Sequence, residues 1–195
     1  MISILLATRN PHKAREFLEL LGDQFQITDL ETLPSIKLPE ETGSTFEQNA
    51  VLKAVTVAKM VDKLVIADDS GLEVDALDGA PGIFSARYAG VKAGNAANID
   101  KLLLELKNLP QRSARFRCVI ALARAGDVLG TFEGVVEGTI VEVRRGSSGF
   151  GYDPVFQPSG FNQTFAEIAP TSKNRISHRA KAVAALRARL RKMTN

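Results

Sequence analysis

Apolar and polar positions alternate along the chain with two different periods. Short apolar runs bounded by turn-forming residues predict strands over residues 2–7, 64–67, 71–77, 114–125 and 128–143. Stretches whose apolar residues recur every three or four positions predict helices over residues 14–21, 44–62 and 95–108, and a last helix from about residue 177. Because strands and helices intermix, with a long hairpin in the second half, the pattern predicts an α/β fold with a mixed sheet.

Turn and capping residues mark the ends of the first two helices. Asn10 followed by Pro11 is typical of an N-cap with proline at the first helical position, and Gly22 is typical of a C-cap. Ser44, with Glu47 three residues on, matches a capping box and predicts the start of the second helix.

The turn between the first strand and the first helix has the features of an anion site. The segment ATRNPHK, residues 7–13, places free backbone N–H groups and the positive end of a helix dipole directly after a strand. Lys13 lies in the first helical turn, where a lysine works against the dipole and gains nothing structurally. An ordinary strand-to-helix turn is the alternative, since the segment is not a glycine-rich phosphate loop.

A lysine interrupts the apolar side of the second predicted helix. At 100° per residue, Lys53 falls inside the stripe that begins with Phe46, and Asn49 lies along the same edge. A lysine in the middle of a core-facing stripe must either extend its ammonium to solvent or meet an anion. We therefore treat Lys53 as a candidate functional residue.

Two adjacent aspartates, Asp68 and Asp69, follow an apolar run directly and precede Ser70 and Gly71. Neighbouring side chains on a strand point to opposite faces, so the two carboxylates share one metal only if a turn begins at Ser70. We expect one carboxylate to bind Mg²⁺ and the other to pair with a lysine or activate water, at the carboxyl end of a central strand. A solvated strand end is the alternative.

Glu40 and Glu41 precede the second helix and are candidates for a further metal ligand. Mg²⁺ takes oxygen ligands and usually only one or two carboxylates, with water and substrate phosphates completing its coordination. An acidic loop favoured by the helix dipole is the alternative.

The second half of the chain carries a glycine-rich loop and a buried-looking arginine. In the segment SSGFGYDP, residues 147–154, the glycines allow close approach to a ligand, and Phe150 and Tyr152 can stack on a base. On the last predicted helix Arg179 falls near the centre of the apolar face, with His178 at one side. That arginine requires a partner, either an internal carboxylate or a bound ligand.

Composition and charge limit the class of protein. The chain has 195 residues, which suits a single domain over residues 1–195, and its formal net charge is only +3. Basic residues near the C-terminus lack interleaved aromatics, so we expect a solvated helix face and no nucleic-acid partner. The single cysteine, the lack of a run of about 20 apolar residues and the lack of a basic leader favour a cytoplasmic protein without a membrane partner.

Taken together, these segments resemble the XTP/dITP diphosphatases, also called inosine triphosphate pyrophosphatases. The matching segments are ATRNPHKAREF, EETGSTFEQNAVLKA, ADDSGLEVDALDGAPGIFSARYAG, GFGYDPVF and ISHRAKA. They occur in the order of the family and span residues 8–182. Arg9 is a departure, since many relatives have glycine at that position.

The resemblance implies an elongated long mixed sheet flanked by helices, with two lobes and a central substrate cleft, and it implies a homodimer. It also implies a Mg²⁺-dependent hydrolysis of ITP, dITP or XTP to the monophosphate and pyrophosphate, with water attacking the α-phosphorus. This activity would remove deaminated purines from the nucleotide pool.

The resemblance also assigns roles to individual residues. Asp69 is implied as metal-linked residue and general base, with Asp68 beside it, and one of Glu40 and Glu41, preferably Glu40, assists the metal. Triphosphate binding is assigned to Thr8, Arg9, Asn10, Pro11, His12, Lys13 and Lys53. Ser70 lies against the substrate, and base recognition is assigned to Phe150, Gly151, Tyr152, Asp153, Lys173, His178 and Arg179.

Two other functions compete with this interpretation. A non-enzymatic nucleotide-binding or nucleic-acid-binding module explains the glycine loop and the basic tail, but it does not explain the Asp68–Asp69 pair. A pyrophosphatase that clears pyrimidine or other modified nucleotides explains the same residues with a different base pocket.

Overall fold

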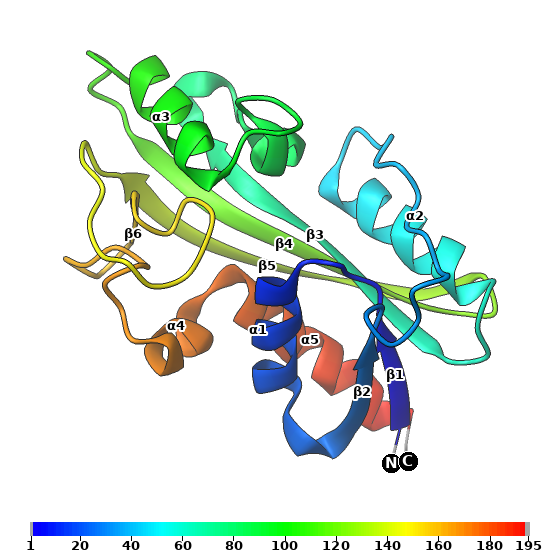
Figure 1. Cartoon of the computed structure of the whole chain (residues 1–195). Helices are drawn as coiled ribbons and strands as arrows, with labels where there is room; N and C mark the ends of the chain where they lie inside the picture. The colour runs from blue at the N-terminus through cyan, green and yellow to red at the C-terminus, as the bar shows by residue number, and fades with distance from the viewer. Residues whose placement is uncertain (1, 194–195) are drawn as a thin grey trace. The chain divides into compact units, whose positions relative to one another are not determined.

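The computed structural model describes residues 2–193, without the side chain of Asp23, and its strands form one six-stranded sheet (Figure 1). The strands are β1 (Ile2–Leu6), β2 (Phe25–Asp29), β3 (Leu64–Val74), β4 (Ser113–Arg124), β5 (Asp127–Ile140) and β6 (Phe156–Pro158). Their order in the sheet is β2-β1-β3-β4-β5-β6. β1 pairs in parallel with β2 and β3, whereas β5 and β6 are antiparallel, so the predicted α/β fold with a mixed sheet is confirmed.

Five α-helices accompany the sheet in the described part of the chain. They are α1 (Pro11–Leu21), α2 (Phe46–Ala58), α3 (Asn95–Glu105), α4 (Pro170–Ile176) and α5 (His178–Lys192). Short 3-10 turns lie at η1 (Gly22–Gln24), η2 (Asp75–Leu77) and η3 (Gly82–Arg87). Among residues 2–193 there is no helix with the length and apolar character that a membrane crossing requires.

The helix caps agree with the sequence prediction at α1 and differ at α2. The Asn10 side chain accepts from the backbone N–H groups of His12 and Lys13, and Gly22 is the C-cap. At α2 the N-cap is Thr45, not Ser44, because the Thr45 hydroxyl accepts from the backbone N–H three residues on.

The predicted helix over residues 44–62 is too long at its C-terminal end. α2 ends at Ala58, and Met60, which a helical period of 100° per residue from Phe46 would place on the same apolar stripe, is 57% exposed. The helical hydrophobic period therefore continues beyond the last residue that reaches the core.

The sequence pattern also divided one strand into two and missed some short elements. The two predicted strands over residues 64–67 and 71–77 are one strand, β3, because Ser70 and Gly71 continue the extended backbone. The sequence pattern missed β2, whose five residues show too short an alternation, and it missed α4, which is only seven residues long.

The chain divides into two compact units. Unit 1 comprises residues 1–69, 118–134 and 179–195, and unit 2 comprises residues 70–117 and 135–178. β3, β4 and β5 each contribute residues to both units.

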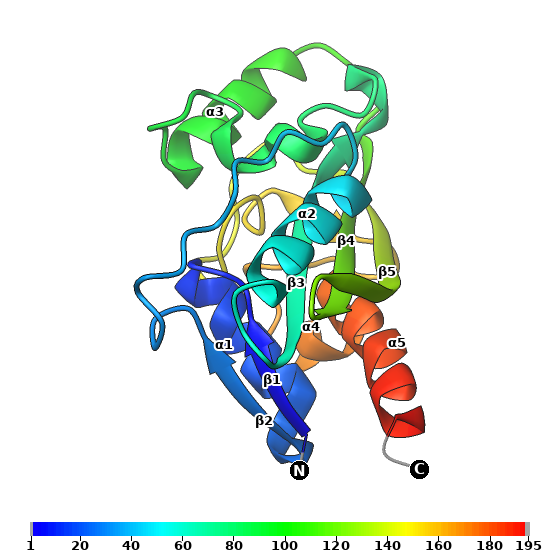
Figure 2. The ribbon, with the colours of Figure 1, turned by 90° about the vertical axis from the view of Figure 1, so that its right-hand side faces the viewer.

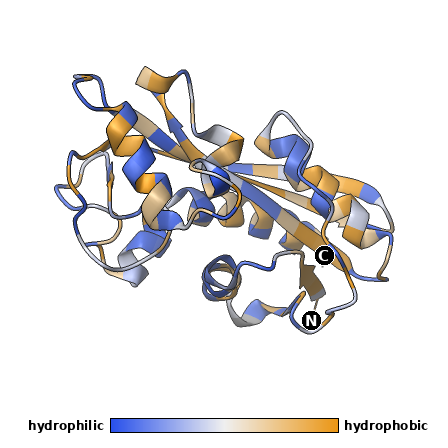
Figure 3. Cartoon of the chain, turned by 45° about the horizontal axis from the view of Figure 1, so that its top comes forward, coloured by the Kyte–Doolittle hydropathy of each residue, from blue (hydrophilic) through white to orange (hydrophobic). Residues whose placement is uncertain are grey.

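Each unit has its own hydrophobic core. In unit 1 α1 and α5 pack on β1, β3 and β4, and the buried residues include Phe17, Leu186 and Cys118, the single cysteine. In unit 2 the core contains an aromatic group in which Phe116 lies 4.7 Å from Phe156 between ring centroids. Figure 3 shows hydrophobic residues along the strands and both hydrophobic and hydrophilic residues on the helices, as expected for amphipathic helices that cover a sheet.

Candidate active site

Asp68 and Asp69 are buried carboxylates on β3 that face opposite sides of the strand. They are 2% and 6% exposed, and the strand continues through Ser70 without a turn, so adjacent side chains alternate. Asp68 contacts side chains of α1 and α5, while Asp69 contacts a side chain of α2. Figure 2 shows the ribbons of β3 and of these three helices. The two carboxylates therefore have different partners.

Asp68 binds cations from two helices. Its Oδ2 lies 2.8 Å from Lys13 Nζ and 3.7 Å from Arg179 Nη2. Arg179 is 1% exposed and also pairs with Glu16 of α1, so this arginine has two internal carboxylate partners. Burial alone would raise the pKa of Asp68, but the charges of Lys13, Arg179 and Lys53 outweigh it and hold that pKa well below its usual range. Asp68 is therefore a permanent anion that fixes two cations.

Asp69 belongs to a second cluster on the α2 side of the strand. Lys53 Nζ donates to Asp69 Oδ1 at 3.2 Å and to Glu41 Oε1 at 2.8 Å. Asn49 Nδ2 donates to Asp69 Oδ2 at 3.1 Å, and Asn49 Oδ1 accepts from the backbone N–H of Gly43 at 2.8 Å. A single amide side chain thus links the segment before α2 to the carboxylate.

The pKa values of Asp69 and Lys53 are both raised, which favours the neutral form of the acid and the charged form of the lysine. Burial raises the pKa of Asp69, and Glu41 adds to the effect, although Lys53, Lys13 and Asn49 oppose it. Burial lowers the pKa of Lys53, but the neighbouring carboxylates outweigh it and the net pKa is raised. Asp69 is thus a stronger base than an ordinary aspartate, and it lies beside an ammonium that stays charged.

Side chains within the turn that precedes α1 accept hydrogen bonds from the backbone of the same turn. Thr8 is buried and its Oγ1 accepts from the Asn10 backbone N–H at 3.2 Å, while Pro11 and His12 are exposed in the first helical turn. Arg9, predicted to bind triphosphate, directs its guanidinium elsewhere, to the backbone of the segment between β2 and α2.

The carboxylates of unit 1 fit a hard divalent cation of the Mg²⁺ type. Glu41, half-buried, reaches the same ammonium as Asp69, whereas Glu40 is exposed. Among residues 2–193 no three His, Cys, Asp or Glu side chains are grouped closely enough to hold a metal by themselves. Mg²⁺ usually takes only one or two protein carboxylates. Asp69 and Glu41 therefore match both the number and the type of ligand that this ion takes from a protein.

Unit 2 contains a second group of predicted site residues around Asp153. Asp153 Oδ2 accepts from Lys173 Nζ at 2.6 Å and from the backbone N–H of Phe150 at 2.9 Å. Lys173 is buried, and its ammonium lies 5.2 Å from the Phe150 ring centroid. Gly149 has a φ of +76°, and a Cβ there would lie 2.0 Å from Asp153 Oδ2, so this turn requires glycine.

The other predicted residues of unit 2 lie in its core, in the loop of residues 149–153 or on β3. Tyr152 is buried and donates from its hydroxyl to the Ser85 carbonyl at 2.9 Å. The His178 imidazole stacks on Phe116 at 4.8 Å between centroids. Gly151 follows in the same loop with a φ of +61°, and Ser70 is half-buried on β3.

Sequence reasoning assigned no role to two residues that contact the site, Glu16 and Asn49. Glu16 is three positions after Lys13 on α1 and therefore shares its face, which was the available signal. Asn49 lies one turn before Lys53 on α2, and its place on the edge of the apolar stripe was visible in the sequence.

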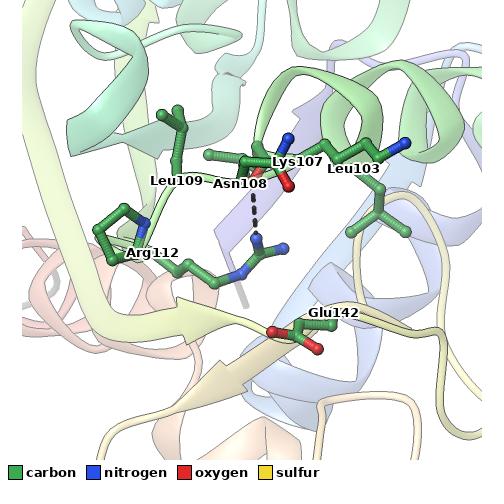
Figure 4. A pocket seen from close by; sticks show the side chains of 8 residues that line it. Leu103, Lys107, Asn108, Leu109, Arg112 and Glu142 are labelled. Atoms are coloured by element: carbon green, nitrogen blue, oxygen red, sulfur yellow. Dashed lines mark hydrogen bonds between the residues drawn. The ribbon is translucent and has the colours of Figure 1, made fainter.

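A pocket of about 490 Å³ in unit 2 lies among residues that were not predicted as site residues (Figure 4). It is lined by Leu103, Leu106, Lys107, Asn108, Leu109, Pro110, Arg112 and Glu142. The Arg112 guanidinium donates to the backbone carbonyls of Leu106, Ile140 and Val141 at 2.6–3.2 Å. The guanidinium of this arginine therefore holds the backbone around the pocket.

Comparison with known proteins places these residues in context. The sequence model of the Ham1 family matches residues 4–189. A protein of Bacillus licheniformis named dITP/XTP pyrophosphatase is 50% identical over 196 residues, covering 97% of this chain and 98% of that protein. A Bacillus subtilis protein of the same name is 49% identical over 186 residues, covering 94% of each chain.

Solved structures that resemble this chain are also Ham1 proteins. The Staphylococcus aureus Ham1 protein is 42% identical with a TM-score of 0.88, covering 98% of this chain and 99% of that chain. A HAM1 protein from Coxiella burnetii is 43% identical with a TM-score of 0.90, covering 98% of this chain and all of that chain.

Proposed function

The chain belongs to the Ham1 family, and on that premise we propose that it hydrolyses the non-standard purine nucleotides dITP, XTP and ITP to the monophosphate and pyrophosphate. It is thus a hydrolase that acts on nucleoside triphosphates. The observation that carries the proposal is the Asp68–Asp69 pair, which presents one fixed anion and one strengthened base on opposite sides of a buried strand.

Asp69 is the general base in this proposal. A carboxylate with a raised pKa accepts a proton from water more readily, and water must attack the α-phosphorus in line as pyrophosphate leaves. Lys53 stays protonated beside it and supplies positive charge for the phosphate oxygens. Asn49 holds the second oxygen of Asp69, which orients the carboxylate.

Lys13 and the first turn of α1 are assigned to the triphosphate. The N-terminus of α1 supplies the positive end of a helix dipole, while its His12 and Lys13 backbone N–H groups donate to Asn10, and Asp68 fixes the position of the Lys13 ammonium. Because Asp68 is fully engaged by Lys13 and Arg179, its role is to position these cations rather than to transfer protons.

We include Mg²⁺ as the cofactor, with Asp69 and Glu41 as the side chains that would hold it. Held there, Mg²⁺ would supply positive charge to the phosphate oxygens, which would favour the departure of pyrophosphate. Lys53 contacts both carboxylates and holds them close to each other. Glu41 is preferred over Glu40 because of that contact.

Unit 2 carries the residues to which we assign recognition of the base. Hypoxanthine and xanthine present a 6-oxo acceptor, which suits the Lys173 ammonium, because this group has two donor hydrogens beyond the one that Asp153 accepts. Adenine presents an amino donor at that position and would leave those donors unpaired, which disfavours it.

A homodimer and a cytoplasmic location are further parts of the proposal. Exposed apolar side chains of unit 2, Phe84 at 54% and Val91 at 87%, are surfaces that a second copy would cover. The single cysteine, Cys118, is a buried free thiol whose pKa is raised to about 12, and an unpaired thiol suits a reducing compartment. Sedimentation equilibrium and cell fractionation test the two statements.

The decisive experiment is a substrate panel with matched variants. We expect kcat/KM for dITP, ITP and XTP, measured as pyrophosphate release with Mg²⁺, to exceed the values for GTP, ATP and UTP. Asp69→Asn should abolish release, whereas Asp62→Asn, a change at an aspartate whose side chain is 94% exposed, should leave it intact. Preference for a pyrimidine or equal rates for all nucleotides would exclude the proposed substrate class, and full activity of Asp69→Asn would exclude the general base.

A further inference from the structure

The side chain of Arg9 makes two hydrogen bonds to a distant segment of backbone. Its Nη2 donates to the carbonyl of Ile36 at 2.6 Å and to the carbonyl of Pro34 at 3.2 Å. Both acceptors are backbone atoms more than twenty positions away, in the segment between β2 and α2. The guanidinium therefore crosses from the turn before α1 to a separate part of unit 1.

The segment that Arg9 holds carries Glu41. Residues 37–43 form neither helix nor strand, so regular backbone pairing does not fix them. Ile36 is a buried anchor at the start of the segment, and at its end the Gly43 backbone N–H donates to Asn49. Glu41, between these two points, reaches Lys53 at 2.8 Å.

We propose that Arg9 is a positioning residue that fastens the 34–36 backbone so that Glu41 is held against Lys53 and Asp69. The inference rests on the proposed function, because Glu41 matters only if the cluster around Asp69 is the reaction centre. It assigns to Arg9 a role through Glu41 and not a contact with the triphosphate. A planar guanidinium suits this role because one nitrogen can donate to two carbonyls in fixed directions.

Limited proteolysis tests the structural half of the proposal without any substrate. Lys37 is exposed and directly follows the clamped carbonyl, so trypsin cleavage of the Lys37–Leu38 bond reports opening of the segment. Arg9→Met should increase the cleavage rate at that bond about tenfold, as expected from the loss of two hydrogen bonds. Arg15→Met, which removes an exposed arginine from α1, is the matched control and should not change that rate.

Kinetics with dITP test the functional half. Arg9→Met should lower kcat about tenfold with KM little changed, the size expected when a supporting contact is lost. In the double variant with Glu41→Gln, removal of Arg9 should cause no further loss, because both changes act through the same carboxylate. Arg9→Lys should restore only part of kcat, since an ammonium does not reproduce the planar donor.

Three results would overturn the proposal. Unchanged cleavage at Lys37 in Arg9→Met would show that the segment does not depend on the arginine. A raised KM that Arg9→Lys restores fully would show a phosphate ligand, for which a point charge suffices. Additive losses in the double variant would show that Arg9 acts independently of Glu41. If the wild-type protein releases no pyrophosphate from dITP, the proposed function is wrong. The proteolysis experiment still decides whether Arg9 holds the 34–36 backbone in place.

Discussion

Replacement of Asp68 by asparagine should weaken the fold far more than the same change at Asp69. Asp68→Asn keeps the shape of the side chain but leaves Lys13 and Arg179 without the anion that both contact in the interior. Removing one partner of a buried ion pair is typically worth about 3–5 kcal/mol, and the side chain of Lys13 is 16% exposed, so part of its charge is solvated. Arg179 also retains Glu16. We therefore expect a loss of about 2–3 kcal/mol in the free energy of unfolding at pH 7.

Asp69→Asn should be close to neutral in the same measurement. Burial raises the pKa of Asp69, so ionisation of this group opposes folding above its usual pKa, and a neutral amide removes that penalty. Lys53 keeps Glu41 as its second partner. Urea unfolding followed by far-UV circular dichroism measures both variants, and the chain contains no tryptophan that would report more directly.

The pH dependence gives this prediction a second test. The pKa of Asp68 is lower in the folded than in the unfolded protein, so its contribution is complete well above pH 4 and disappears as the pH falls through the folded pKa. The stability difference between wild type and Asp68→Asn should thus be constant between pH 5 and pH 7 and shrink below about pH 4. A difference that stays constant to pH 3, or wild-type stability of Asp68→Asn at pH 7, would refute the assignment of Asp68 as a paired, permanent anion.

Three further predictions follow from the cluster around Asp69. Gly43→Ala should reduce pyrophosphate release, because a Cβ at that position would lie 2.7 Å from Asn49 Oδ1, whereas Gly94→Ala, where no atom lies within 4 Å, is the control. The acid limb of log kcat/KM against pH should lie above the usual aspartate pKa, since Asp69 must be ionised to accept a proton, and Lys53→Met should move this limb to still higher pH. An unmoved limb would show that the lysine does not act on the base. Chelation of divalent cations should abolish release and added Mg²⁺ should restore it, with the unfolding midpoint changing little; activity in chelator would exclude the cofactor.

Local sequence patterns predicted those features that depend on neighbouring residues. The Asn10 cap of α1 and the buried Lys53 of α2 follow from spacings of three or four positions, and both are present. The alternation of a strand separates Asp68 from Asp69 without knowledge of any partner.

Long-range pairings account for what the sequence did not predict. Arg9 reaches a segment 25–27 positions away, and Glu16 meets Arg179 across 163 positions, so no local period indicates either contact. Glu40 and Glu41 have the same chemistry and adjacent positions, and only the path of an irregular segment decides which one faces Lys53. β2 is too short for its alternation to distinguish it from a loop, and it becomes a strand by pairing with β1.

The opposite orientations of the two aspartates also explain how this cluster reconciles stability with chemistry. A catalytic base requires a pKa that is not too low, whereas fixing two buried cations requires a carboxylate that is always ionised. One carboxylate cannot satisfy both demands, because the cations that hold it would also depress its pKa. On adjacent strand positions the demands fall on different faces: Lys13 and Arg179 surround Asp68, while burial dominates at Asp69. A one-residue shift of β3 would turn each aspartate to the opposite face of the strand. It would therefore remove both the carboxylate that fixes the two cations and the carboxylate that acts as base.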